Sequence, residues 1–159
     1  MIDSDTFRSV LGRFASGVTI VTARDGAGED HGMTASAFCS LSLEPPLVLI
    51  CVDHAASMHE LMLSHPRLGI SILSSDQEAY SRRFADKDTD NRFDGIAYER
   101  GDSGVVLLDG ALAHLECAII EHHDAGDHTI VIAEVERAAA KEARRPLLYY
   151  RGGYALLER

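Results

Sequence analysis

The sequence predicts a mainly β protein, an antiparallel barrel with a few short flanking helices. Six or seven runs rich in β-branched and other apolar residues are separated by turn residues. The few helical patterns are not interleaved regularly between these runs, as the right-handed crossovers of a parallel sheet would require. With 159 residues and no repeat or linker, we expect a single domain over residues 1–159.

Composition and charge exclude two classes of partner. The formal net charge is -10, whereas a nucleic-acid-binding protein needs a basic surface and an anionic membrane repels an acidic one. No apolar run approaches the roughly 18 residues of a spanning helix, and the acidic N-terminus does not resemble a signal peptide. The three cysteines form no C-x-x-C pair, which suits a reducing compartment. We therefore expect a cytoplasmic protein that binds neither nucleic acid nor membrane.

The first half of the chain begins with an amphipathic helix, which Gly17 is expected to end in a left-handed conformation. Residues 18–22 are dense in β-branched side chains, and turn residues at 25–28 lead into a second strand from about His31. Residues 47–52 are apolar on both faces, which predicts a central strand. The apolar face of the helix consists of Phe7, Val10, Leu11 and Phe14.

The second half contains two short helices and four more strands. Ser57 is expected to cap a helix carrying Met58, Leu61 and Met62, and Asp76 a helix that runs to Phe84. Residues 86–102 are charged and lack apolar periodicity, which indicates a long surface loop. The strands are predicted at 68–73 (alternating and half-buried), 111–121 (apolar on its odd-numbered face), 129–135 and 147–150, with a turn at 124–127.

One segment combines small and hydroxyl side chains in a strand context. Residues 32–46 read GMTASAFCSLSLEPP. Small side chains let a planar ligand approach the backbone, where free amide and hydroxyl groups can donate to it, but the same composition also fits an edge strand and loop. The G-x-G-x-x-G fingerprint and the G-x-x-x-x-G-K-[ST] phosphate loop are absent from the sequence. A Rossmann domain therefore does not hold any nucleotide cofactor of this chain.

Five segments together resemble the flavin reductase family. Residues 32–46, with their continuation to Asp53, resemble the family's flavin-binding motif. Residues 7–19, 81–85, 126–130 and 148–154 resemble further family segments in the same order. Each motif is short, but their joint order and spacing are specific and span essentially the whole chain. The sequence is similar to the small reductase components of two-component flavin-dependent monooxygenases.

The resemblance implies an FMN-binding split β-barrel, usually a homodimer with flavin sites near the interface. It implies transfer of a hydride from NADH or NADPH to FMN or FAD, to supply a partner monooxygenase. His128 matches the family's histidine near the nicotinamide. The residues expected at the flavin are Thr34, Ala35, Ser36, Ala37, Ser40, Cys51, Val52, Asp53, Ser57, Arg83 and Phe84.

Physical chemistry supports these assignments without a catalytic nucleophile. Hydride transfer needs two closely stacked rings, and its chemistry belongs to the cofactors. An anionic flavin also needs local cations in a chain of net charge -10, and Ser57 at a helix start could place backbone amides on its phosphate. The densest basic set is Arg82, Arg83, Lys87 and Arg92, which would otherwise be a solvated surface.

Other readings of the sequence stay open. One is a split-barrel flavoenzyme that acts on another substrate, and another is a non-catalytic flavin- or haem-binding module. No metal site is expected, because the neighbours His122 and His123 should point to opposite faces of a strand. Cys39 is expected to be a small buried residue rather than a redox thiol.

Overall fold

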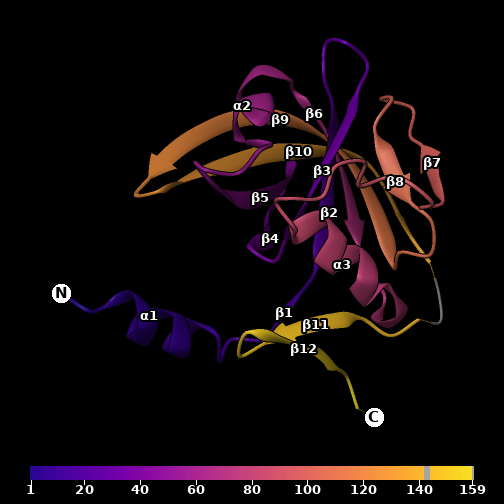
Figure 1. The fold of residues 1–159 in the computed structure, drawn as a ribbon. Coiled ribbons are helices and arrows are strands. Elements are labelled where there is room, and N and C mark those ends of the chain that lie inside the picture. The colour runs from indigo at the N-terminus through magenta and orange to yellow at the C-terminus, as the bar shows by residue number, and fades with distance from the viewer. Residues whose placement is uncertain (142–143, 159) are drawn as a thin grey trace.

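Seven antiparallel strands form the main sheet within residues 1–141 and 144–158, the part of the chain that the computed structural model describes (Figure 1). Their order across the sheet is β3-β2-β6-β9-β10-β5-β4, so the sheet is not closed. This confirms the predicted mainly β, antiparallel split barrel. The strands are β2 (Thr19–Arg24), β3 (Asp30–Ala35), β4 (Phe38–Leu43), β5 (Pro46–Asp53), β6 (Arg67–Ile72), β9 (Ala113–Ala125) and β10 (His128–Ala140).

The split in the barrel lies between two strands that are consecutive in the chain. β3 and β4 are the two edges of the sheet, yet only Ser36 and Ala37 separate them. Three Cα–Cα steps of about 3.8 Å cannot span more than about 11 Å. The sheet must therefore curl until its edges approach each other at this linker.

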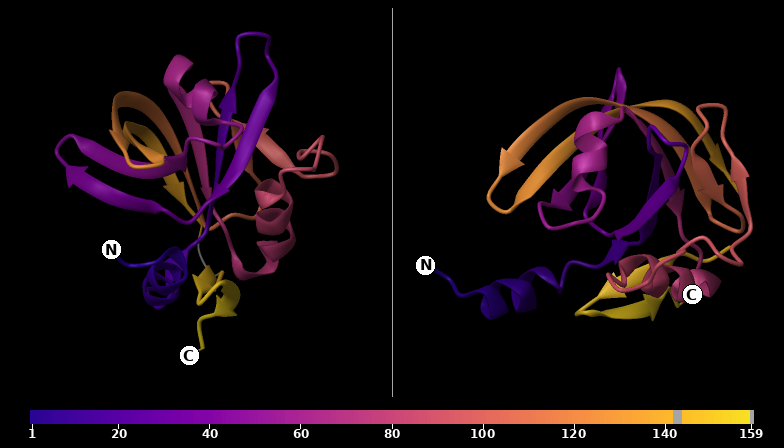
Figure 2. Two further views of the ribbon diagram at one scale, coloured as in Figure 1. Left: turned by 60° about the vertical axis from the view of Figure 1, so that its left-hand side comes forward. Right: turned by 45° about the horizontal axis from the view of Figure 1, so that its top comes forward.

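Smaller elements surround the barrel. A three-stranded sheet consists of β1 (Ser16–Gly17), β11 (Leu147–Tyr150) and β12 (Gly153–Leu156), and a hairpin consists of β7 (Tyr98–Arg100) and β8 (Val106–Leu108). The helices are α1 (Ser4–Leu11), α2 (His59–Ser64) and α3 (Glu78–Ala85), which follows the 3-10 turn η1 (Ser75–Gln77). Figure 2 shows α1 and the three-stranded sheet together at one end of the barrel. Within the described residues, no helix is long and apolar enough to cross a membrane.

Two apolar clusters stabilise the fold, one on each side of the main sheet. Because neighbouring residues on a strand point to opposite faces, Val21 belongs to one cluster and Ile20 to the other. The first cluster fills the barrel and includes Ile50 and Val131. The second lies under α3 and β8, where Phe84 is 1% exposed. This second cluster fixes the end of α3 against the sheet.

The N-terminal helix differs from the prediction at its C-terminal end. Asp3 caps α1 by accepting a hydrogen bond of 2.9 Å from the backbone N–H of Thr6, as its sequence allowed. The helix ends at Leu11, however, because Gly12 is the C-cap, and Gly17 lies in β1. None of the helical residues is buried. The predicted apolar face thus exists but has no partner within the described part of this chain.

Two predicted helix caps are wrong. The N-cap of α2 is Met58 rather than Ser57, and it makes no side-chain cap hydrogen bond. Asp76 lies inside η1, and Ser74 caps that turn because its side chain and that of Gln77 form a reciprocal capping box. In both cases the helix or turn begins one or two residues away from the capping residue that the sequence predicted.

More residues are buried than the alternating sequence patterns of the strands predicted. β6 is buried at Leu68 and at the three residues that follow, not on one face only. The predicted odd face of β9 includes buried Cys117, but Glu116 is buried as well because the loop after β7 covers it. The charged segment 86–102 contains buried Ile96 and the strand β7. Cys39, expected to be buried, is exposed on the edge strand β4.

Candidate functional site

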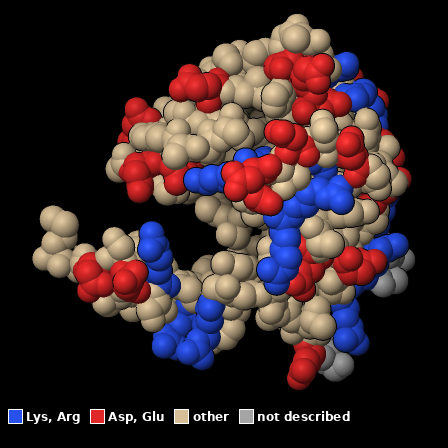
Figure 3. Space-filling model, in the orientation of Figure 1, with Lys and Arg blue, Asp and Glu red and all other residues tan. Residues whose placement is uncertain are grey.

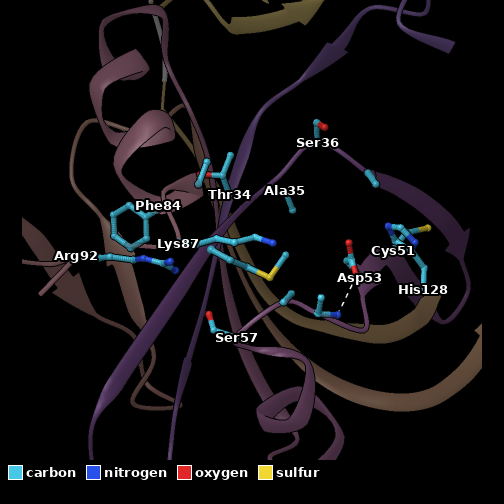
Figure 4. A pocket seen from close by; sticks show the side chains of 15 residues that line it. Thr34, Ala35, Ser36, Cys51, Asp53, Ser57, Phe84, Lys87, Arg92 and His128 are labelled. Carbon is cyan, nitrogen blue, oxygen red and sulfur yellow. Dashed lines mark hydrogen bonds between the residues drawn. The ribbon is translucent and has the colours of Figure 1, made fainter. Parts of the chain in front are cut away.

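A pocket of about 410 Å³ opens at the split in the barrel (Figure 4). This volume falls in the range of roughly 300–1,000 Å³ that is typical of ligand sites. Four stretches line it, namely residues 33–37 with the β3–β4 linker, residues 51–57 at the end of β5, residues 84–92 at the end of α3, and the start of β10. The open edge of the sheet is thus the place where these distant stretches meet.

The linker between β3 and β4 presents small side chains and unpaired amides. The carbonyl of Ala37 accepts from the Cys51 N–H at 3.0 Å, and the carbonyl of Ser36 accepts from the Phe38 N–H at 2.9 Å. Within residues 1–141 and 144–158, the N–H groups of Ser36 and Ala37 have no acceptor. The Thr34 hydroxyl donates to the Ser81 carbonyl at 2.6 Å, which ties this wall to α3. These hydrogen bonds fasten the wall to β5 and α3, and two of its own donors are free among the described residues.

The turn after β5 forms a second wall. The Asp53 carboxylate accepts a hydrogen bond of 2.8 Å from the Ala55 N–H, and the Asp53 carbonyl accepts one of 2.9 Å from the Ala56 N–H. These two bonds hold small residues at the pocket surface. Burial raises the pKa of the half-buried Cys51 thiol, with a smaller effect from nearby Cys39, so Cys51 is protonated at neutral pH and contributes no negative charge.

Two cations line the pocket on the side of α3 (Figure 4). The Arg92 guanidinium donates to the carbonyls of Gly32 and Asp86, each at 2.7 Å. Among the residues that the structure describes, neither Lys87 nor Arg92 has a carboxylate within 4.0 Å. Their positive charges are therefore not neutralised by ion pairs, and that of Arg92 is held in place.

His128 lies on the opposite side of the pocket from these cations (Figure 4). It is the first residue of β10 and pairs with Asp53 across the strands, which confirms the predicted position where a turn enters a strand. Its Nδ1 lies 2.7 Å from an Asp127 carboxylate oxygen. This hydrogen bond is the main reason why the pKa of Asp127 lies below its usual value. The His128 side chain is 42% exposed, so it can reach a ligand in the pocket.

The structure brings together most of the residues predicted for the site. His128 lines the pocket together with Thr34, Ala35, Ser36, Ala37, Cys51, Asp53, Ser57 and Phe84.

Three predicted residues lie outside this lining. Val52 is fully buried, because strand alternation turns its side chain into the core. Arg83 donates instead to the carbonyl of Asp94, and Ser40 lies on β4 beyond the linker, with an exposed side chain.

Sequence reasoning did not assign four further lining residues, Met33, Ala55, Ala56 and Ala85. The small pair Ala55-Ala56 between Asp53 and Ser57 was the signal available for this turn. Of the four basic residues considered, Lys87 and Arg92 line the pocket. Arg82 instead binds Glu78 at 2.7 Å and stacks over the Tyr154 ring at 4.8 Å.

Comparison with known proteins places the chain in a family. The model of the "Flavin reductase like domain" matches residues 11–158, so the chain belongs to this family. It is 43% identical over 156 residues to an NADH-dependent FAD reductase of Streptomyces globisporus, covering 96% of this chain and 85% of the relative. It is 38% identical over 161 residues to HsaB, the reductase subunit of a flavin-dependent monooxygenase of Mycobacterium tuberculosis, covering 99% and 84%.

A solved structure agrees with the fold in detail. The NADH:FAD oxidoreductase SgcE6 of Streptomyces globisporus C-1027, in complex with NAD and FAD fragments, superposes with a TM-score of 0.92 at 40% sequence identity. The match covers 99% of this chain and 96% of that chain. The fold of this family is therefore the split barrel described above.

The pocket of this chain fits a flavin on its own geometry. A flat ring needs close approach to the backbone, which the small side chains at 35–37 and 55–56 allow. Its polar edge needs donors, which the free amides of Ser36 and Ala37 supply. Its phosphate needs positive charge, which Lys87 and Arg92 carry without a carboxylate partner among the described residues.

Proposed function

We propose that this protein is an NADH-dependent flavin reductase, which transfers a hydride from reduced nicotinamide to a flavin. The observation that carries the proposal is the pocket at the split, where free amides and unpaired cations face each other across small side chains. When bound, the flavin supplies the electron-accepting ring, and the protein contributes binding and orientation. The family membership supports the same activity.

Each wall of the pocket has a role in this proposal. The backbone of residues 34–37 binds the flat ring, and the amides of Ser36 and Ala37 donate to its polar edge, where they favour negative charge. The turn at Asp53 orients the chain between ring and phosphate, and Lys87 and Arg92 bind the phosphate. His128, at the rim, hydrogen-bonds the nicotinamide and holds it against the flavin. It is not assigned a proton transfer.

Steady-state oxidation of NADH and NADPH with FMN, FAD and riboflavin in turn tests the proposal. We expect rapid NADH oxidation that saturates with added flavin, and full loss of yellow colour on dialysis, because the pocket is open and offers only non-covalent contacts. A protein that binds flavin but never oxidises a nicotinamide would support the non-catalytic module instead. Colour that survives denaturation would indicate a permanently attached flavin.

The product of this reaction requires a consumer. Free reduced flavin reacts with oxygen, and HsaB is by name the reductase subunit of a monooxygenase. We infer that this chain likewise supplies reduced flavin to a partner monooxygenase. The inference requires that reduced flavin leave the pocket, so a stopped-flow mixture of the NADH-treated protein with a flavin-dependent oxygenase should transfer the flavin. Failure of any transfer would contradict it.

We also propose that the protein is a homodimer, with α1 covered by a second copy. Four large apolar side chains of this N-terminal segment are 52–82% exposed, namely Phe7, Val10, Leu11 and Phe14, and α1 stands away from the barrel in Figure 2. Such a patch on a stable protein marks an interface. Sedimentation should show a dimer, and Val10→Glu should weaken it while the matched change Ser9→Glu does not. A monomeric wild type would refute the proposal.

We further propose that residues 1–159 form one domain that works in a reducing compartment, the cytoplasm. The family model supports the first point, since it matches residues 11–158 without interruption. The second is supported by free thiols at Cys39, Cys51 and Cys117. Fractionation of the native host would test the location, and a disulfide in the isolated native protein would count against it.

A further inference from the structure

A second pocket adjoins the first and shares three lining residues with it. It has a volume of about 490 Å³, and Ser57, Lys87 and Arg92 belong to both linings. Its other walls are Glu29 with the first residues of β3 (residues 30–32), Met58, and the loop 89–94. The two unpaired cations therefore stand at the junction of two cavities, where a ligand that extends through both would place its most negative group.

The second pocket differs from the first in charge. Its lining includes Glu29, Asp90 and Asp94, and within residues 1–141 and 144–158 none of these carboxylates has a basic group within 4.0 Å. Asp30 also lines it, but Arg100 neutralises this carboxylate at 2.8 Å. In Figure 3, acidic and basic side chains lie side by side across the middle of the visible face.

This charge pattern selects the chemistry of the occupant. Free carboxylates repel a further phosphate, but they accept hydrogen bonds from ribose hydroxyls, as the acidic residue of a dinucleotide site does. The half-buried ring of Phe93 offers an aromatic surface to a base. A nucleoside whose own phosphate lies at Lys87 and Arg92 meets all of these features.

We propose that the flavin substrate is FAD in preference to FMN, with its diphosphate at Lys87 and Arg92 and its adenosine in the acidic pocket. The inference rests on the proposed function for the position of the flavin ring in the first pocket. FMN ends at its single phosphate and leaves the acidic pocket without a ligand, so the contacts of this pocket act on FAD alone.

Calorimetric titration with FAD, FMN and riboflavin tests this assignment. The double variant Asp90→Asn/Asp94→Asn keeps the side-chain shapes and removes two exposed carboxylates. One hydrogen bond to a charged group corresponds to about a tenfold change in affinity. We expect wild-type protein to bind FAD about tenfold more tightly than FMN, and the double variant to lose this difference while binding FMN no more weakly than wild type does. The matched control Asp88→Asn/Glu44→Gln, which changes the charge equally outside both pockets, should keep it.

Competition identifies the occupant. Adenosine, which has no phosphate to bind Lys87 and Arg92, should compete with FAD but not with FMN. Equal wild-type affinities for FAD and FMN would overturn the inference. So would a double variant that raises only the KM for NADH, since the acidic pocket would then bind the nicotinamide dinucleotide. A protein that binds FAD in this manner but reduces no flavin would instead refute the proposed function and leave this inference standing.

Discussion

Replacing Arg92 by Met separates the charge of this residue from its structural contacts. The guanidinium is half-buried, lines the first pocket and donates to the carbonyls of Gly32 and Asp86. The substitution therefore removes a fixed positive charge from the proposed phosphate site. It also removes one hydrogen bond that joins the loop after α3 to Gly32 of β3, and one within that loop, to Asp86. The two losses act on different measurable quantities.

Their magnitudes follow from the surroundings of Arg92. A pair of unit charges about 4 Å apart interacts with about 1 kcal/mol in bulk water and about 4 kcal/mol near a protein surface. Arg92 is between these limits, so we take about 2 kcal/mol, or about 30-fold in the dissociation constant for FMN. The two lost hydrogen bonds cost about 1–3 kcal/mol of stability, which lowers Tm by several degrees, roughly 2–4 °C for each kcal/mol.

The assay compares FMN with riboflavin, which differ by the phosphate. Arg92→Met should weaken FMN binding about 30-fold at low salt, less at high salt, and should leave riboflavin binding nearly unchanged. Lys87→Met is the companion variant, because Lys87 makes no side-chain hydrogen bond among the described residues and its loss should not lower Tm. Equal weakening of riboflavin and FMN would refute the assignment of these cations to the phosphate.

Three further predictions concern the walls and the stability of the fold. Ala37→Leu should block approach of the ring and weaken riboflavin and FMN equally with little change in Tm, because Ala37 is exposed; normal binding would remove the linker from the site. His128→Ala should lower kcat/KM for NADH by roughly 2- to 12-fold with flavin affinity unchanged, whereas weakening of both ligands together would indicate a structural role. The pKa of Asp25 is lowered to about 2, first by the hydrogen bond with His31, so its stabilising contribution is present above about pH 4 and disappears as pH falls towards 2. Asp25→Asn should therefore lower Tm at pH 6 but not at pH 2, and an equal loss at both would contradict this.

The strands of the barrel could be predicted because their local patterns agree with their environment. The apolar run of β5 and the β-branched run of β10 pair with each other along seven residues, and both carry core side chains such as Ile50 and Val131. The part of the site at residues 34–37 could also be predicted from the sequence. Of these small side chains only Ala35, which is 6% exposed, packs in the core, so the composition of the others indicates a binding surface.

What the sequence did not determine depends on contacts between distant segments. Glu116 is buried because Ser103 donates to its carboxylate through both N–H and hydroxyl, a contact that no periodicity in β9 reveals. Lys87 and Arg92 lie in a charged segment without periodicity. They line the pocket, whereas Arg82 and Arg83 do not, because this segment folds back against β3. Gly32 shows the same dependence, since a Cβ there would lie 2.6 Å from the ring of Phe84.

The pocket at the split has a consequence for how the chain acquires its ligand. Its walls come from stretches that lie between residues 33 and 128, and the last of them, His128, takes its place when β10 pairs with β5. Contacts of this kind are formed late and slowly during folding, because a long loop must close first. A chain in which β10 has not yet paired with β5 therefore has an incomplete pocket. A flavin that binds only the folded barrel would shift the folding equilibrium towards it, by an amount that grows with the flavin concentration relative to Kd.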